Sequence, residues 1–291
     1  MISESIPSFD NTLIHFTVDG DGPLDFLLCD GIGCDGYIWR YLRPHLRERG
    51  RIIHPHIRGH GNSGVPQDLC LVGIGDVATD FRRVLDHVQS RRVVVFGHSM
   101  GVQVALETWH QAPDRVAAIV LMCGSHGHPA STFHDGRAMR LLLPLLRAGA
   151  RAGGETLRRI WRTVTPTRMS ALVAQLTELH PDFLRPHDLE LYLGHLANMD
   201  PQVFFEMLGG AEAHTASPYL TQIDVPALLI AGEHDRFTPA WLSAEMARRI
   251  PTAEFLCVRD GTHAAPVEQP TEINLRVEQF LNAHFGRKTA P

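Results

Sequence analysis

The residues best suited to chemistry surround a serine in the segment Gly97–Gly101 (GHSMG). This segment directly follows an apolar run, Val93–Phe96, and opens a helical pattern. Flanking glycines let the backbone make a sharp strand-to-helix turn that lifts a serine hydroxyl above the edge of a sheet. The same turn places the N–H of Met100 at a helix N-terminus, where it can stabilise an oxyanion. We therefore predict Ser99 as a nucleophile and Met100 as an oxyanion donor.

A carboxylate and a histidine follow two later apolar runs. Asp235 lies in a polar turn after Ala227–Ala231, and His263 lies in a glycine-containing loop after Glu254–Val258. The carboxyl ends of parallel strands meet at one edge of a sheet, so we expect Ser99, Asp235 and His263 to converge there. A serine, a carboxylate and an imidazole placed together could act as nucleophile, acid and base.

Neighbouring residues offer alternatives for these roles. Glu233 and His234 lie beside Asp235 and compete with it for the acid position, although solvation of the turn would also explain them. His98 lies inside the nucleophile turn, and we interpret it as a packed neighbour of the substrate site. Glu233 and His234 therefore remain alternatives to Asp235 in the predicted triad.

The elements that must position these residues alternate along the chain. The expected strands are Leu13–Val18, Leu24–Cys29, Arg51–His56, Val93–Phe96, Val116–Cys123, Ala227–Ala231 and Glu254–Val258. The expected helices are Tyr37–Arg49, Asp76–Gln89, Met100–Gln111, Pro239–Arg249 and Thr271–His284. Alternation of this kind predicts an α/β fold, with a mostly parallel central sheet flanked by helices.

This alternation stops between residues 126 and 222, where only helical patterns follow one another. Candidate helices are Leu141–Leu146, Leu157–Val164, Ser170–Leu179, Leu189–Asn198 and Val203–Leu208. We interpret the segment as a helical cap inserted between two strands of one sheet. The predicted organisation is a core of residues 1–125 and 223–291 with a cap of residues 126–222, whose apolar side chains line an acyl pocket.

The chain resembles the α/β-hydrolase superfamily, in which the order is nucleophile, acid, histidine. The resemblance implies that Asp235 is the acid, which holds the imidazole tautomer, and that His263 is the base, which takes the Ser99 proton. The resemblance covers about Leu13–His284, with the insertion where the family carries its cap domain. It implies an esterase- or lactonase-like serine hydrolase that cleaves a carboxylic ester or lactone of a small, largely apolar substrate. The reaction would pass through an acyl-enzyme on Ser99, without a cofactor. A weakly catalytic or non-catalytic small-molecule receptor of the same fold is the alternative.

The loop after the strand Leu24–Cys29 departs from the family pattern, because Asp30 stands where the family usually has histidine. The resemblance makes Ile32 the second oxyanion donor. We predict that Asp30, Gly31 and Gly33 contact substrate together with His98. A carboxylate facing the oxyanion would oppose catalysis, so the Asp30 side chain should turn away, accepting hydrogen bonds from loop amides or pairing with an arginine, Arg58.

Gly31–Gly36 also matches the glycine spacing of a dinucleotide-binding turn. The acid expected about twenty residues later is missing, and the corresponding region holds Arg58, which suits a phosphorylated ribose. An NADP-dependent oxidoreductase is therefore a lesser alternative.

Composition excludes several other functions. A net charge of −5 argues against nucleic-acid binding, and no apolar stretch reaches the length of a membrane span. The only lysine, Lys288, excludes a Schiff base or a phosphate-loop lysine. The histidine pairs His54 with His56 and His126 with His128 lack the supporting ligands of a zinc site, so we predict no metal. Five cysteines, interpreted as reduced thiols, favour a cytoplasmic location, and the oligomeric state stays open.

Overall fold

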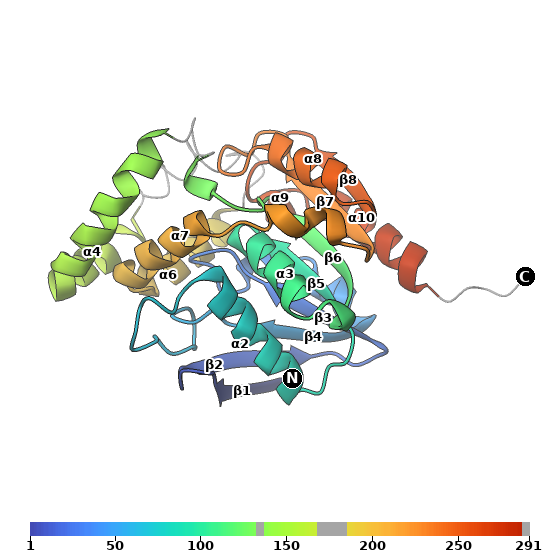
Figure 1. The fold of residues 1–291 in the computed structure, drawn as a ribbon, viewed down its shortest axis with the longest axis horizontal. Coiled ribbons are helices and arrows are strands. Elements are labelled where there is room, and N and C mark those ends of the chain that lie inside the picture. The colour runs from blue at the N-terminus through green and yellow to red at the C-terminus, as the bar shows by residue number, and fades with distance from the viewer. Residues whose placement is uncertain (132–136, 168–184, 287–291) are drawn as a thin grey trace, which may run out of the picture.

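A computed structural model describes residues 1–131, 137–167 and 185–286. In this part of the chain an eight-stranded sheet has the order β1-β2-β4-β3-β5-β6-β7-β8 (Figure 1). The strands are β1 Ile2–Pro7, β2 Leu13–Asp19, β3 Leu24–Cys29, β4 Gly50–Pro55, β5 Val93–His98, β6 Val116–Met122, β7 Ala227–Gly232 and β8 Ala253–Val258. Strands β3 to β8 run parallel, whereas β1 and β2 are antiparallel to their neighbours.

Helices cover both faces of the sheet. The α-helices are α1 Arg43–Arg47, α2 Ile74–His87, α3 Met100–Gln111, α4 Arg137–Val164, α6 Pro186–Asn198, α7 Pro201–Ala213, α8 Ala240–Arg249, α9 Ala265–Glu268 and α10 Pro270–Phe285, with 3₁₀ turns η1 Tyr37–Trp39, η2 Pro113–Arg115, η3 Pro129–Ser131 and η5 Ser217–Gln222. Alternate side chains of β5 enter opposite cores: Val93 and Val95 pack with α2 and α3, and Val94 and Phe96 pack with α10. The predicted fold class, an α/β sheet with a helical cap, is confirmed.

Two parts of the core differ from the sequence prediction. Strand β1 is absent from the prediction, because Ile2–Pro7 is almost wholly exposed at the sheet edge and carries no buried pattern. The single helix expected over Tyr37–Arg49 is wrong. It divides into η1 and α1, because Pro44 has no N–H to continue a helix and is well suited to starting a new one.

The cap lies between β6 and β7, which are neighbours in the sheet, so the chain leaves the sheet and returns beside its exit. Helix α4 contains both expected helices Leu141–Leu146 and Leu157–Val164. It is interrupted at Gly154, whose φ of 47° is not helical. The cap carboxylate Glu206 on α7 binds Arg147 and Arg151 of α4. The expected helix at Ser170–Leu179 lies outside the described residues. The division at residues 126 and 222 stays a prediction.

None of the helices in the described ranges combines the length and apolar character needed to cross a bilayer.

Candidate active site

Ser99 lies in a strained turn between β5 and α3. Its φ of 56° is one that residues with a side chain rarely adopt. The chain passes so close to itself that a Cβ on Gly97 would lie 2.3 Å from the carbonyl oxygen of Gly101, and a Cβ on Gly101 would lie 2.0 Å from that of Cys29. This turn therefore needs glycine at both positions, which explains the spacing around the serine.

A chain of hydrogen bonds links three side chains at the carboxyl edge of the parallel strands. His263 Nε2 lies 2.9 Å from Ser99 Oγ, and His263 Nδ1 lies 2.9 Å from Asp235 Oδ2. The residues come from the loops after β5, β7 and β8. The structure therefore brings together the three residues expected to converge, in the order that nucleophilic catalysis requires.

The carboxylate of Asp235 is held by its own turn as well as by His263. Its Oδ1 accepts the N–H groups of Phe237 at 2.8 Å and Thr238 at 2.9 Å, and its Oδ2 accepts the Thr238 hydroxyl at 2.8 Å. Burial raises the pKa of Asp235, but the charge and hydrogen bonds of His263 and Thr238 outweigh burial and lower it. Asp235 therefore stays ionised at neutral pH, with its charge beside the imidazole of His263.

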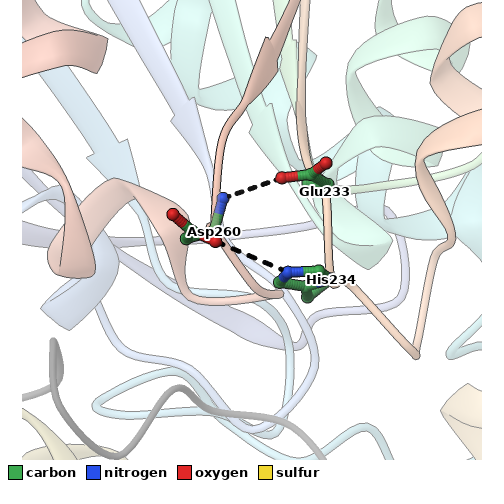
Figure 2. Close-up of side chains that lie close together, drawn as sticks. All are labelled: Glu233, His234 and Asp260. Atoms are coloured by element: carbon green, nitrogen blue, oxygen red, sulfur yellow. Dashed lines mark hydrogen bonds and ion pairs between the residues drawn. The ribbon is translucent and has the colours of Figure 1, made fainter.

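The other candidate acids have different partners (Figure 2). Glu233 Oε2 accepts the N–H of Asp260 at 3.0 Å, and His234 Nε2 lies 3.6 Å from Asp260 Oδ1. The three side chains are exposed, with possible ligand atoms within 4.8 Å of one another, and their mutual contacts account for this arrangement. Glu233 and His234 thus tie the Asp235 loop to the loop that precedes His263.

A cavity of about 330 Å³ opens onto Ser99. The two predicted oxyanion donors, Met100 and Ile32, both line it. Met100 is the first residue of α3, where helix N–H groups have no partner inside the helix. Of the predicted substrate-binding residues, His98 lines the cavity, whereas Asp30, Gly31 and Gly33 do not. Gly31 instead backs the nucleophile, since a Cβ there would lie 2.9 Å from Ser99 Cβ.

Apolar side chains of the cap form much of the cavity wall. They are Met139, Leu146, Leu196, Phe204, Phe205 and Leu208. Trp161 of α4 packs against the rings of Phe204 and Phe205 and donates to the carbonyl of Leu196, so it supports the wall from behind. Not every apolar residue of the cap faces the cavity, because Leu141 and Leu145 are exposed.

Asp30 anchors the loop after β3. Its buried carboxylate accepts the N–H of Gly36 at 3.0 Å and the Trp39 indole N–H at 2.7 Å, and His54 Nε2 lies 2.8 Å away. Of the two expected arrangements, the bond from a loop amide is the one that forms, and Arg58 pairs with Asp80 instead. Burial raises the pKa of Asp30, and the His54 and Trp39 contacts outweigh burial and lower it. This placement favours support of the loop over direct contact with substrate.

Replacing Asp30 tests that supporting role. In Asp30→Leu the three groups that now point at the carboxylate lose their acceptor, so we expect the free energy of unfolding to fall by about 3 kcal/mol or more. Asp30→Asn keeps one acceptor oxygen and should retain at least about a tenth of the hydrolytic rate. Urea unfolding and ester hydrolysis measure the two effects, with exposed Asp21→Leu as the control. Equal stability of Asp30→Leu and wild type would contradict the account.

Arg58, the residue on which the NADP alternative depends, is fully buried. Its Nε and Nη2 donate to the two carboxylate oxygens of Asp80 at 2.7 and 2.6 Å, and Nη1 lies 3.1 Å from Asp10 Oδ2. A guanidinium enclosed in this way is not available to a ribose phosphate. The buried Arg58 therefore gives the NADP alternative no support.

The histidine pairs that first suggested a metal have protein partners. His54 Nε2 contacts Asp30, and His56 Nδ1 accepts the N–H of Asn62 at 3.0 Å. His128 Nδ1 lies 2.7 Å from the carbonyl oxygen of Glu212. Each of these contacts uses one of the two ring nitrogens with which the histidine could bind a metal.

His98 is a neutral histidine in the wall behind the base. Its Nε2 donates to the carbonyl oxygen of His263 at 2.9 Å, and its buried Nδ1 has no partner among the described residues. Burial, with the nearby charge of His263, lowers the pKa of His98 from 6.5 to about 3. A protonated His98 therefore belongs to the unfolded chain and not to the folded one.

Acid should consequently destabilise the fold. Because the folded pKa lies below the unfolded one, the unfolded chain binds the proton first as the pH falls from 6.5 towards 3. We expect His98 alone to lower the free energy of unfolding by up to about 1.4 kcal/mol per pH unit in this window. Urea unfolding at several pH values should give a shallower slope for His98→Gln, which retains a donor, but not for exposed His187→Gln. Parallel slopes for wild type and His98→Gln would disprove the assignment.

Comparison with known proteins identifies the family to which the chain belongs. The family model for the alpha/beta hydrolase fold matches residues 26–270. The chain therefore belongs to the α/β-hydrolase family and shares its fold.

Individual relatives are distant. Protein ABHD8 of Mus musculus is 24% identical over 264 residues, which are 86% of this chain and 53% of that protein. The chain thus spans about half the length of this curated relative. Among solved structures, the enol-lactonase from Burkholderia xenovorans LB400 has a TM-score of 0.79 at 21% identity, covering 96% of this chain and 100% of that one. Esterase RhEst1 from Rhodococcus sp. ECU1013 has a TM-score of 0.79 at 21% identity, covering 98% and 100%.

Proposed function

We propose that this chain hydrolyses carboxylic esters or lactones of small, largely apolar substrates through an acyl-enzyme on Ser99. The observation that carries the proposal is the hydrogen-bonded series from Asp235 through His263 to Ser99, which ends at an apolar cavity. The structural neighbours described as an enol-lactonase and an esterase support this substrate class.

The first half of the reaction forms the acyl-enzyme. His263 Nε2 removes the proton of Ser99 as Oγ attacks the substrate carbonyl carbon. The carbonyl oxygen becomes an oxyanion, which the N–H groups of Met100 and Ile32 stabilise. When the tetrahedral intermediate collapses, the bond to the alcohol oxygen breaks and His263 gives that oxygen its proton. In a lactone the new alcohol remains attached to the acyl group.

Water completes the second half. His263 takes one proton from a water molecule as the water oxygen attacks the acyl carbon. The bond from that carbon to Ser99 Oγ then breaks, and the proton passes from His263 to the serine. Asp235 stays ionised throughout. Its carboxylate accepts the hydrogen bond from the Nδ1–H of His263 and stabilises the imidazolium that forms in each half.

The apolar wall leads to a prediction about chain length. Each methylene that enters the cavity is worth about 0.8 kcal/mol, so kcat/KM for 4-nitrophenyl esters should rise about fourfold per carbon from acetyl until the cavity is full. A parallel series of lactones shows whether a ring is accepted. Values that stay flat or fall from acetyl to hexanoyl would contradict an apolar acyl site. Turnover of neither series, together with no fluorophosphonate adduct, would favour the receptor alternative.

A further inference from the structure

One polar side chain in the apolar cavity wall has no role in the proposed reaction. Gln103 is 1% exposed and lines the cavity from α3. It follows Ser99 by four residues, and both residues line the same cavity. A buried amide in an apolar wall is costly unless its polar atoms are hydrogen-bonded.

The amide nitrogen of Gln103 is fully used inside the protein. Nε2 donates to the carbonyl oxygen of Ala211 at 2.9 Å and lies 3.1 Å from His214 Nδ1. A carbonyl only accepts, so the side-chain nitrogen, and not the oxygen, must face Ala211. Among the described residues no donor contacts the Gln103 oxygen.

A charged network behind Gln103 fixes this orientation. Since His214 Nδ1 accepts from Gln103, its Nε2 carries the proton and donates to Glu107 Oε2 at 3.2 Å. Burial raises the pKa of Glu107, but hydrogen bonds from His214, Gln111 and Tyr219 outweigh burial and lower it to about 2. At neutral pH the ionised Glu107 carboxylate accepts the Nε2 proton of His214 and so favours the tautomer whose Nδ1 accepts from Gln103.

A second buried polar group of the wall behaves in the same way. Ser125 is 2% exposed, lines the cavity and donates its hydroxyl proton to the carbonyl oxygen of Gly127 at 3.1 Å. Its oxygen therefore presents only lone pairs. Gln103 and Ser125 thus both offer acceptors to a ligand and no donor.

From this geometry we propose that Gln103 Oε1 recognises a hydrogen-bond donor, a hydroxyl or amide N–H, on the acyl half of the substrate. This inference rests on the proposed ester or lactone hydrolysis. The alcohol oxygen must reach His263 Nε2 to be protonated, so the alcohol lies toward the loops after β7 and β8. The acyl half then extends along α3 toward Gln103 and Ala211.

Matched esters test the proposal. The donor series comprises 4-nitrophenyl 2-hydroxybutanoate, 3-hydroxybutanoate and N-acetyl-β-alaninate, and the isosteres 2-methylbutanoate and 3-methylbutanoate replace hydroxyl by methyl. At position 2 or position 3, kcat/KM of wild type for the hydroxyl ester should exceed kcat/KM for its methyl isostere by about tenfold or more. Gln103→Met, which keeps length and removes the acceptor, should reverse this ratio. The methyl-substituted ester measured on the same variant controls for general damage.

Gln202→Met is the matched control, because Gln202 lies on α7 and is not part of the cavity wall. It should retain the wild-type ratio. A wild-type preference for methyl at every position, or a ratio that Gln103→Met leaves unchanged, would overturn the proposal while ester hydrolysis itself stood. Absence of ester hydrolysis would contradict the proposed function and not donor recognition itself. Donor recognition is tested without turnover by calorimetry, which compares the binding of ethyl 3-hydroxybutanoate and ethyl 3-methylbutanoate to the Ser99→Ala protein.

Discussion

Ser99→Ala is expected to lower kcat/KM for every accepted ester by at least about 10⁴-fold. Alanine has no oxygen to attack the carbonyl, and no acyl-enzyme can form. The fold should persist, because the strained backbone at this position is set by the glycines around it and the lost hydrogen bond is worth about 1 kcal/mol. Initial rates with a medium-chain nitrophenyl ester, combined with urea unfolding, measure both effects.

A fluorophosphonate probe, which reacts with nucleophilic serines, identifies the residue responsible for the activity. Wild type should acquire one adduct, mapped to Ser99 by peptide mass spectrometry, and Ser99→Ala should acquire none. Ser3→Ala, on the exposed edge strand β1, is the control and should react like wild type. Retention of a tenth of the wild-type rate by Ser99→Ala would remove it as the nucleophile.

Asp235→Asn is expected to lower kcat by about 10⁴-fold, the loss known for this change in serine triads. The amide oxygen must take the place of Oδ1, because the N–H groups of Phe237 and Thr238 point there. The amide NH₂ is then forced toward His263 Nδ1. Nδ1 becomes an acceptor, the ring proton moves to Nε2, and the imidazole can no longer receive the proton of Ser99.

The neighbouring carboxylate supplies the control for this substitution. Glu233→Gln leaves an oxygen that can accept the N–H of Asp260, so its rate should stay within about threefold of wild type. Stopped-flow or steady-state kinetics at neutral pH compare the two variants. An inactive Glu233→Gln beside an active Asp235→Asn would transfer the acid role to Glu233.

The catalytic geometry was predictable because it depends on local sequence. Gly97 and Gly101 indicate a tight turn, because a side chain at either position would collide with the backbone. Ser99, Asp235 and His263 each closely follow an apolar strand. Strand ends in a parallel sheet share an edge, so chain order was enough to expect their convergence.

The supports of the site were not predictable, because they depend on contacts distant in sequence. The sequence placed Trp39 in a long helix and gave His54 no partner, yet both converge on Asp30 once Pro44 divides that helix. Gln103 fits an ordinary helix, and its orientation follows only from Ala211 and His214 in the cap. Loop and cap packing, rather than local pattern, selects these partners.

The links between the Asp235 loop and the loop before His263 combine exposed and backbone bonds. The side chains of Glu233 and His234 contact Asp260 (Figure 2). In addition, the backbone N–H of His234 donates to the carbonyl oxygen of Gly261 at 2.8 Å. Salt screens the exposed charges, whereas the backbone bond does not depend on ionic strength. The two loops therefore stay joined under conditions that weaken their side-chain contacts.

Joined loops have a consequence for inactivation by heat. Proteins open locally in cooperative units before they unfold as a whole, and loops at the end of a sheet belong to the least stable of these units. Because backbone and side-chain bonds join the loops of Asp235 and His263, we expect the two loops to open as one such unit, whereas Ser99 lies in the turn between β5 and α3. Warming should thus withdraw the acid and the base from the serine in one step, and cooling should return both together as long as the core has not melted.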